Sequence, residues 1–238
     1  AVKAGKKAAE KAIKISRAAI KNSREIMADI KEEVAVIRDR DPAARNDLEV
    51  LLLYSGLHAI LAYRVSHKLY VSGHSFSARA VSQIARFFTG IEIHPAAKIE
   101  GGVFIDHGSG VVIGETAEVH KGTVIYQGVT LGGTGKERGK RHPTIMENVT
   151  LSAGAKVLGG FTVGEGAKIG AGAVVLKEVP PYATVVGVPG RVVRIRPPET
   201  EDVTHTGIVA RTALSLEAKE EMAKEAARIA EEKRNEKK

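Results

Sequence analysis

Between Ile91 and Val186 an aliphatic residue recurs at almost every sixth position. Glycine often follows it, as in Ile113-Gly114 and Val163-Gly164. Internal repeats of this kind decide an architecture: here each six residues make one short strand and one turn, and three such units close a triangular coil. Stacked coils bury the aliphatic side chains as a ladder, so the pattern predicts a parallel β-helix. The thirteen ladder positions are Ile93, Ile99, Ile105, Ile113, Val119, Ile125, Leu131, Ile145, Leu151, Val157, Val163, Ile169 and Val175.

The six-residue phase breaks at two places. The third and fourth ladder positions are eight residues apart, and the extra residues fall in Asp106–Gly110. The seventh and eighth are fourteen residues apart, which requires a looped-out insertion over Gly132–Pro143. Each segment contains a histidine beside charged residues, and solenoids often carry insertions on their binding face. We therefore expect these two segments to form the active site. A sandwich of ordinary alternating strands, the competing interpretation, would not keep this phase through thirteen positions.

The residues before the repeat have helical periodicity. Residues 3–38 carry a narrow apolar seam at heptad spacing, which predicts one long helix. Docking on other helices is the expectation, and a basic membrane-surface helix is the alternative, although the seam lacks the aromatic and leucine side chains that such helices use. Asp41-Pro42 ends this helix, because proline disfavours a helical residue before it. Further helices are expected from about Pro42, capped by Asp41, to Ser55-Gly56, from Leu57 to Val71 and from Ser77 to Phe88.

The sequence thus predicts an α+β chain in three parts. Residues 1–90 form an all-helical domain, residues 91–196 a left-handed parallel β-helix that is the catalytic domain, and residues 197–238 a linker and a charged C-terminal helical tail. Residues 191–196 are expected to form a final strand that closes or crosses the end of the solenoid. The tail from residue 214 to 235 is rich in Ala, Glu, Lys and Arg, which favours helix.

Composition narrows the class of protein. The chain has 238 residues, a net charge of +8 and a pI near 9.6, which suits an anionic substrate such as a phosphate-bearing coenzyme. Cysteine is absent, so thiol chemistry on the protein and disulfides are excluded. No apolar run reaches eighteen residues and no signal-like segment is present, so we expect a cytoplasmic protein without a membrane or nucleic-acid partner.

Several motifs together resemble the serine O-acetyltransferase family. The hexapeptide repeat alone is shared by many acyltransferases, whereas the glycine-rich insertion and the preceding helical segment are far more specific. The resemblance covers residues 28–195. It implies transfer of an acetyl group from acetyl-CoA to the hydroxyl of L-serine, giving O-acetylserine and CoA in the first step of cysteine biosynthesis. The motifs are Arg40–Arg45, Gly56–Ala59, Thr89–Pro95, Phe104–Gly108, Gly114–Ala117, Gln127–Lys136, Lys140–Thr144 and Gly187–Arg191.

The chemistry of the reaction selects the candidate catalytic residues. A serine hydroxyl is a weak nucleophile at neutral pH, so a general base must accept its proton, and a histidine has a suitable pKa. The resemblance implies that His107 is this base, that Glu92 orients it and that His142 contacts substrate and helps to stabilise the oxyanion.

The resemblance also implies the binding residues. Arg141, whose guanidinium binds carboxylates bidentately, would hold the serine carboxylate, with His142 adjacent to it. Asp41 and Asp106 would bind the ammonium group, although Asp41 is also interpretable as a helix cap alone. Acetyl-CoA would lie along the β-helix edge between subunits, near Gly133, Ala153 and Lys168. It is a co-substrate, no cofactor is expected to be bound permanently, and the histidine spacing predicts no metal site.

Partners and rival functions stay open at this level. The resemblance implies a homotrimer and a dimer of trimers. In the family a terminal isoleucine inserts into O-acetylserine sulfhydrylase, whereas this chain ends in Asn235–Lys238, so that partner is left open. The rivals are acyl transfer to another acceptor or from succinyl-CoA, a non-catalytic trimeric assembly module, and a metal-dependent β-helix enzyme such as a carbonic anhydrase, whose histidine triad this spacing does not match.

Overall fold

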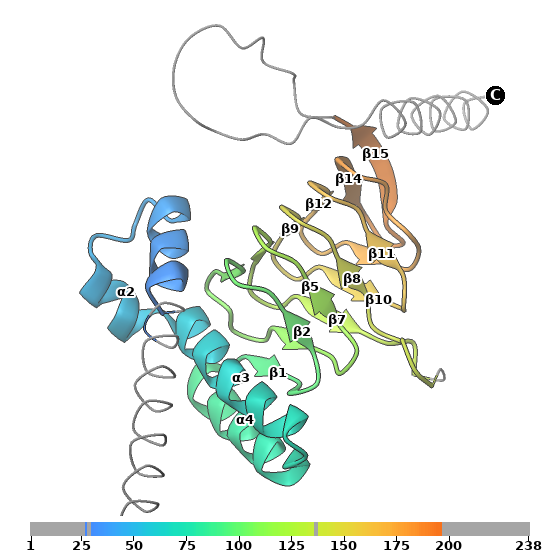
Figure 1. Ribbon diagram of the computed structural model, residues 1–238. Helices are drawn as coiled ribbons and strands as arrows, with labels where there is room; N and C mark the ends of the chain where they lie inside the picture. The colour runs from blue at the N-terminus through green and yellow to red at the C-terminus, as the bar shows by residue number, and fades with distance from the viewer. Residues whose placement is uncertain (1–26, 28–29, 136–137, 197–238) are drawn as a thin grey trace, which may run out of the picture.

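The computed structural model describes residues 27, 30–135 and 138–196, and shows helices packed against one end of a parallel β-helix (Figure 1). Three sheets form the walls of the β-helix. Sheet A has the strand order β1-β4-β7-β10-β13, sheet B β11-β8-β5-β2, and sheet C β15-β14-β12-β9-β6-β3. The strands of the repeat are β1 Glu92–Ile93, β2 Lys98–Ile99, β3 Phe104–Ile105, β4 Val112–Ile113, β5 Glu118–Val119, β6 Val124–Ile125, β7 Thr130–Gly132, β8 Thr144–Ile145, β9 Thr150–Leu151, β10 Lys156–Leu158, β11 Thr162–Val163, β12 Lys168–Ile169 and β13 Val174–Val175.

The predicted aliphatic ladder is confirmed. Each of the thirteen positions falls in one of these strands, and every one is buried. The register stacks them directly, because Ile93 pairs with Ile113, Ile113 with Leu131, and Val157 lies between Leu131 and Val175. One coil cannot cover its own ladder, so the core forms only when coils stack.

Successive strands change sheet at three corners. The C–A corner follows β3, β6, β9 and β12, the A–B corner follows β1, β4, β7 and β10, and the B–C corner follows β2, β5, β8 and β11. The Asp106–Gly110 phase break therefore lies at the C–A corner, and the 132–143 insertion at the A–B corner. Sheet A separates the two loops.

Among the residues that the structure describes, four helical segments precede the β-helix. A helix is described over residues 30–40, followed by α2 Asp47–Leu53, α3 Ser55–Val71 and α4 Ser75–Thr89. Most of the long helix predicted over residues 3–38, and the whole predicted tail, lie outside the described residues. Helix α4 ends at Thr89 and is capped by Gly90, whose φ of 72° is the left-handed conformation that glycine adopts readily.

The predicted start of the second helix is wrong. Helix α2 begins five residues after Pro42, because the side chain of Asn46 caps it by accepting a hydrogen bond from the Glu49 backbone N–H at 2.9 Å. The Asp41 side chain instead accepts from the Ala43 N–H at 2.8 Å and forms a local turn. Asp41 is therefore not the cap of this helix, and its carboxylate remains beside the β-helix.

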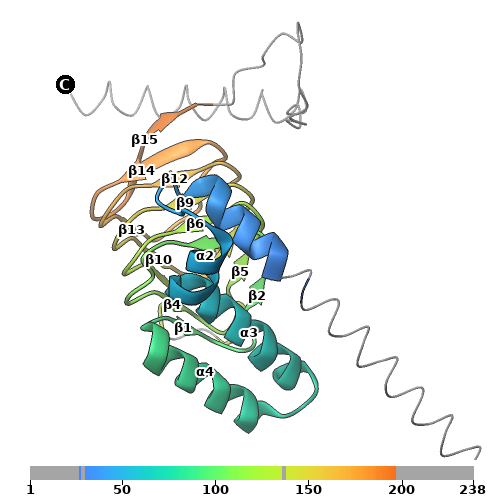
Figure 2. The same cartoon turned by 90° about the vertical axis from the view of Figure 1, so that its left-hand side faces the viewer.

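Helices α3 and α4 lie beside the first coil (Figure 2). Side-chain hydrogen bonds join them to it. The Tyr63 hydroxyl donates to the Ala97 carbonyl at 2.6 Å and accepts from the Ile99 N–H at 3.1 Å. The Ser82 hydroxyl donates to the Ile93 carbonyl at 2.6 Å. Arg64 donates to the carbonyls of Ile99 and Glu100. These bonds hold the helices rigidly over the β1 end of the β-helix.

A hairpin closes the other end. Strand β15, Arg191–Ile195, pairs antiparallel with β14, Ala183–Val186, which continues sheet C. The predicted final strand at the end of the solenoid is thus confirmed.

Within the described parts of the chain, no single helix is long and apolar enough to cross a membrane. Helices α2 and α3 are long and apolar enough only when taken together, and they are bent by 68° relative to one another.

Candidate active site

The loop at the C–A corner presents His107 to solvent. Its backbone has φ 58°, a conformation that is uncommon for a residue with a side chain. Two tight contacts hold this shape: Gly108 N–H donates to the Asp106 carbonyl at 2.6 Å, and Ser109 N–H donates to the His107 carbonyl at 2.8 Å. The imidazole is 73% exposed, and its Nε2 lies 3.9 Å from Oδ1 of Asp106. Strained backbone of this kind is concentrated at functional sites.

The helical region places a second carboxylate at this corner. The Tyr54 hydroxyl donates to Oδ2 of Asp41 at 2.6 Å, and this bond, followed by the Ala43 N–H, holds the pKa of Asp41 below its usual value. A positive charge on His107 would lower that pKa further, so the two side chains lie within electrostatic range of each other. The same bond, followed by burial and by the negative charges of Asp41, Glu49 and Asp106, raises the pKa of Tyr54 to about 12. The structure therefore brings Asp41, Asp106 and His107 together.

Glu92 lies one coil below this loop. Its strand pairs with Val112, and the Gly90 carbonyl just before it accepts from the Gly110 N–H at 2.9 Å. Its carboxylate forms an ion pair with Arg86 at 3.1 Å. Among the described contacts none joins Glu92 to His107, so the orienting role of Glu92 stays a prediction.

The A–B corner holds the other predicted substrate residues. Arg141 and His142 are the last residues of the insertion before Pro143, and both are fastened to Thr116 in the loop after β4. The Arg141 guanidinium forms an ion pair with Glu115, and this bond is the main reason that the pKa of Glu115 is lowered. Arg141 is thus held at the surface of this corner by a carboxylate, in the manner in which it would hold a substrate carboxylate.

His142 is seated deeply, in contrast to His107. Its residue is only 8% exposed, and burial followed by the positive charge of Arg141 lowers its pKa. Its ring lies against the Cα of Gly114, where an added Cβ would overlap the imidazole. The two histidines therefore differ in environment: one is exposed on a strained loop and one is packed in a corner.

The structure thus divides the predicted residues between two corners. Asp41, Asp106 and His107 gather at the C–A corner, and Arg141 and His142 gather at the A–B corner, on the two edges of sheet A. The predicted CoA-binding residues are also spread along the β-helix. Gly133 lies beside Arg141 at the A–B corner, Ala153 lies at the C–A corner, and Lys168 lies in β12 of sheet C.

Sequence reasoning missed two residues that shape these groups. Tyr54 holds Asp41, and Thr116 holds both Arg141 and His142. Thr116 belongs to a motif that carried the family resemblance, which is the only signal for it in the sequence. Tyr54 has no such signal, because its role depends on the hydrogen bond that its side chain, just before α3, makes to Asp41.

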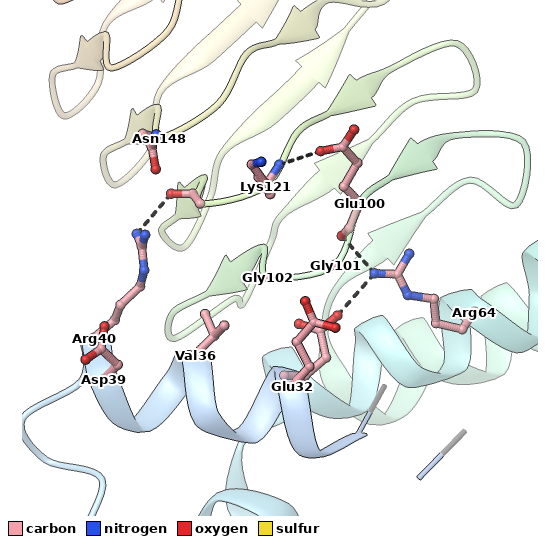
Figure 3. Close-up of a pocket in the computed structure, with 12 residues that line it drawn as sticks. Glu32, Val36, Asp39, Arg40, Arg64, Glu100, Gly101, Gly102, Lys121 and Asn148 are labelled. Atoms are coloured by element: carbon pink, nitrogen blue, oxygen red, sulfur yellow. Dashed lines mark hydrogen bonds and ion pairs between the residues drawn. The ribbon is translucent and has the colours of Figure 1, made fainter. Parts of the chain in front are cut away.

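A pocket of about 730 Å³ lies away from both corners (Figure 3). It is formed where the helix over residues 30–40 faces the B–C corner, and Arg64, Glu100 and Lys121 are among its lining residues. Arg64 pairs there with Glu33 at 3.1 Å. No predicted site residue lines this pocket. Within the described residues no cluster of three or more His, Asp or Glu side chains is arranged to hold a metal ion.

Comparison with known proteins assigns the family. Residues 142–177 match the bacterial transferase hexapeptide family, and residues 2–62 match the family described as serine acetyltransferase, N-terminal. The serine acetyltransferase of Bacillus licheniformis is 66% identical over 164 residues, which make up 69% of this chain and 76% of that protein.

Solved structures agree in fold. A serine acetyltransferase in complex with cysteine has a TM-score of 0.72 and 43% identity, covering 77% of this chain and 71% of that chain. The serine acetyltransferase of Brucella abortus strain S19 in complex with coenzyme A has a TM-score of 0.71 and 42% identity, covering 73% of this chain and 70% of that chain.

The fold and its repeat define a hexapeptide transferase built on a left-handed parallel β-helix. Within that class, the chain belongs to the serine acetyltransferase family. It is accordingly a transferase that moves an acetyl group to serine in cysteine biosynthesis.

Proposed function

We propose that His107 is the general base of this acetyl transfer. The observation that carries the proposal is the exposed imidazole held at φ 58° on the phase-break loop, beside the carboxylate of Asp106. The imidazole accepts the proton of the serine hydroxyl as Oγ attacks the thioester carbonyl carbon of acetyl-CoA. The tetrahedral intermediate then expels the CoA thiolate, which takes that proton from the imidazolium. The products are O-acetylserine and CoA, and the histidine is restored.

Charge complementarity supports the orientation of serine. The carboxylates of Asp41 and Asp106 bind its ammonium group near His107, and the low pKa of Asp41 keeps that side chain anionic at neutral pH. Arg141 exchanges part of its bond to Glu115 for the serine carboxylate. Glu92 orients His107 from the coil below through Oε1, since its ion pair with Arg86 uses Oε2.

The arrangement of the corners supports a site shared between protomers. The groups that would bind the two ends of serine lie on opposite edges of sheet A, so the C–A corner of one protomer meets the A–B corner of its neighbour in a cyclic trimer. Helix α4 supports further association into a dimer of trimers, because Phe76, Phe87 and Phe88 are 88%, 83% and 79% exposed in the single chain.

Acetyl-CoA is the proposed acetyl donor. The relative from Brucella abortus binds coenzyme A, and that relative shares the β-helix. We place the coenzyme along the edge of the β-helix, where the small residues Gly133 and Ala153 suit the pantetheine arm and the exposed Lys168 amine meets a polar group. No resident cofactor is needed for this reaction, since the thioester supplies the activated acetyl group.

Release of free thiol from acetyl-CoA tests the proposal. Purified wild type, His107→Ala and the matched control His74→Ala are assayed with L-serine, with L-homoserine and without an acceptor. His74 is an exposed histidine whose side chain makes no capping bond at the start of α4. We expect serine-dependent release to fall by about 10²–10⁴-fold in His107→Ala and to stay unchanged in the control. A His107→Ala rate equal to that of wild type would refute the general-base role. A preference for L-homoserine would show that L-serine is not the acceptor.

A further inference from the structure

Thr116 lies at the centre of a dense set of hydrogen bonds at the A–B corner. Its hydroxyl Oγ1 accepts the backbone N–H of Arg141 at 3.0 Å and that of His142 at 3.0 Å. The same Oγ1 lies 2.9 Å from Nδ1 of His142, and the Thr116 backbone N–H donates to this Nδ1 at 3.1 Å. Its carbonyl accepts from Nζ of Lys140 at 2.8 Å. One threonine thus fastens the end of the insertion to the loop after β4.

The donor and acceptor inventory of these groups determines where the histidine proton resides. A threonine hydroxyl has one hydrogen and two lone pairs. The two backbone N–H groups occupy the lone pairs, so the hydroxyl hydrogen is left for Nδ1 of His142. The Thr116 backbone N–H can only donate, and it points at the same atom. Nδ1 therefore acts as an acceptor and carries no proton.

We infer that Thr116 holds His142 as the neutral tautomer with its proton on Nε2, so that His142 serves this enzyme as a hydrogen-bond donor and not as a base. Thr116 is then a positioning residue for the reaction, acting through His142. The inference rests on the proposed function in placing His142 at the substrate, whereas the tautomer itself follows from the hydrogen bonds alone.

The surroundings of His142 favour the same state. Burial and the positive charges of Arg141 and Lys140 disfavour the imidazolium. The negative charge of Glu115 favours it, but this effect is smaller than the effect of burial and smaller than that of Arg141. His94 is the other titratable ring on this side, and its own pKa is lowered first by burial and then by Arg79. The ring plane is fixed as well, since His142 lies directly against Gly114. The neutral ring with a defined donor nitrogen is thus supported by geometry and by charge.

A fixed donor complements an exposed base. When serine attacks the thioester, negative charge develops on the carbonyl oxygen, and a donor that needs no reorganisation stabilises it. An Nε2–H group meets that requirement, while His107 at the other corner takes the hydroxyl proton. The two histidines then have opposite roles, one accepting a proton and the other presenting one.

Nitrogen NMR tests the tautomer directly. Ring ¹⁵N shifts of histidine distinguish the Nε2–H form, the Nδ1–H form and the imidazolium, and the His142 signals are assigned by their loss in His142→Gln. We expect the full-length protein to show Nε2–H at His142 at pH 7 and still at pH 6.5, the ordinary pKa of histidine. An Nδ1–H ring or an imidazolium at pH 7 would overturn the inference. The readout is independent of activity, so it remains valid even if His107→Ala proves fully active.

Two pairs of variants test the role in the reaction. A glutamine amide can donate from a position like Nε2 but cannot act as a base, so His142→Gln should keep a kcat at least several-fold above that of His142→Ala, which should lose about 10²–10³-fold. Equal losses in both variants would contradict a donor role.

The second pair of variants distinguishes the effect of the Thr116 hydroxyl from the effect of the size of the side chain. Thr116→Ser keeps the hydroxyl and should remain within a few-fold of wild type. Thr116→Val removes the hydroxyl at equal size, and should lower kcat about ten-fold or more and show both His142 tautomers by NMR. A Thr116→Val protein with a wild-type rate and a single Nε2–H ring would show that Thr116 does not position His142. If the valine variant does not fold, the wild-type spectrum and the glutamine–alanine pair still decide the matter.

Discussion

At the A–B corner, a residue without a side chain positions its neighbour by leaving space for it, just as other residues position theirs by hydrogen bonds. Gly114 has no side chain, and the His142 ring occupies the space where a Cβ would stand. Gly114→Ala should therefore displace His142 while leaving its backbone bonds to Thr116 in place. We expect kcat/KM for serine to fall toward the value of His142→Ala, by about 10²-fold, with a β-rich circular dichroism spectrum retained.

Gly101→Ala is the matched control for that variant. Its added Cβ would meet only the carboxylate end of Glu32, a flexible side chain that can move aside. The control should keep wild-type kinetics. If Gly114→Ala also kept wild-type kinetics, the position of the His142 ring against Gly114 would not matter for the reaction.

A second residue-scale prediction concerns Tyr54 and pH. Its hydroxyl is the main cause of the lowered pKa of Asp41. A carboxylate whose folded pKa is lowered adds stability above its unfolded pKa and loses that contribution as pH falls through the folded pKa. Tyr54→Phe should therefore lower the unfolding free energy at pH 7 by about 1 kcal/mol, a small value because the pair is near solvent. The loss should shrink below pH 3.8, the ordinary pKa of aspartate.

Kinetics provide the second readout for Tyr54→Phe. A less well-held Asp41 should raise KM for serine more than it lowers kcat. Tyr70→Phe is the control, because Tyr70 lies in the same helical region and meets His94 by its ring edge. Equal pH profiles of unfolding for Tyr54→Phe and wild type would disprove the link to Asp41.

The sequence could identify many candidate residues but not their local partners. His107 and His142 stand out because they interrupt a strict repeat. Thr116 and Tyr54 do not, because the bond from Thr116 to His142 spans 26 residues, the bond from Tyr54 to Asp41 spans 13, and both depend on how loops fold back. Likewise, nothing in the spacing of Glu92 indicates its ion pair with Arg86, which comes from the packing of α4 on the first coil.

At the scale of elements, the two-residue strands depend on the ladder for their stability. Leu151 in β9 is fully buried between neighbouring coils, whereas Leu176 just after β13 is 55% exposed. Leu151→Ala should lower the free energy of unfolding by about 2–5 kcal/mol, since it removes buried methyl groups and leaves a cavity. Urea unfolding at a fixed protomer concentration measures the loss.

Leu176→Ala is the control for the ladder prediction. The same substitution at an exposed position should change stability by about 0.5 kcal/mol or less. Similar losses at both positions would mean that the exposed apolar side chains, and not the ladder, dominate the stability of the assembled protein.

Element boundaries show where pattern reasoning reached its limit. All thirteen strands could be predicted because one period governs them, and burial of one aliphatic residue per turn leaves little freedom in register. The start of α2 could not, because Asp41 and Asn46 are equally good capping residues by type. Tertiary contacts decide between them, because Asp41 accepts a hydrogen bond from Tyr54 and Asn46 caps the helix.

At the scale of the whole molecule, the two corners predict complementation between inactive variants. In the proposed cyclic trimer, homotrimers of His107→Ala, or of His142→Ala, would have no complete site. In trimers assembled from an equal mixture, an interface is complete when one protomer supplies His107 and its neighbour supplies His142. Random assembly should restore about a quarter of the wild-type activity.

Co-refolding of differently tagged variants, followed by the thiol-release assay, measures this recovery. A mixture of His107→Ala with the double variant His107→Ala/His142→Ala is the control, because no interface in it regains His107. Recovery in the control, or none in the test mixture, would argue against a site shared between protomers.

The capped ends of the β-helix set a limit on growth. A stack of parallel coils offers an open strand edge at each end, and such an edge is a template for fibrils. Here α3 and α4 cover the β1 end, with Tyr63 and Ser82 bonding to the first coil. At the far end the chain reverses into β15, an antiparallel strand with Arg191 and Arg194 exposed. A repeat that would otherwise polymerise end to end is thereby confined to a molecule of finite length.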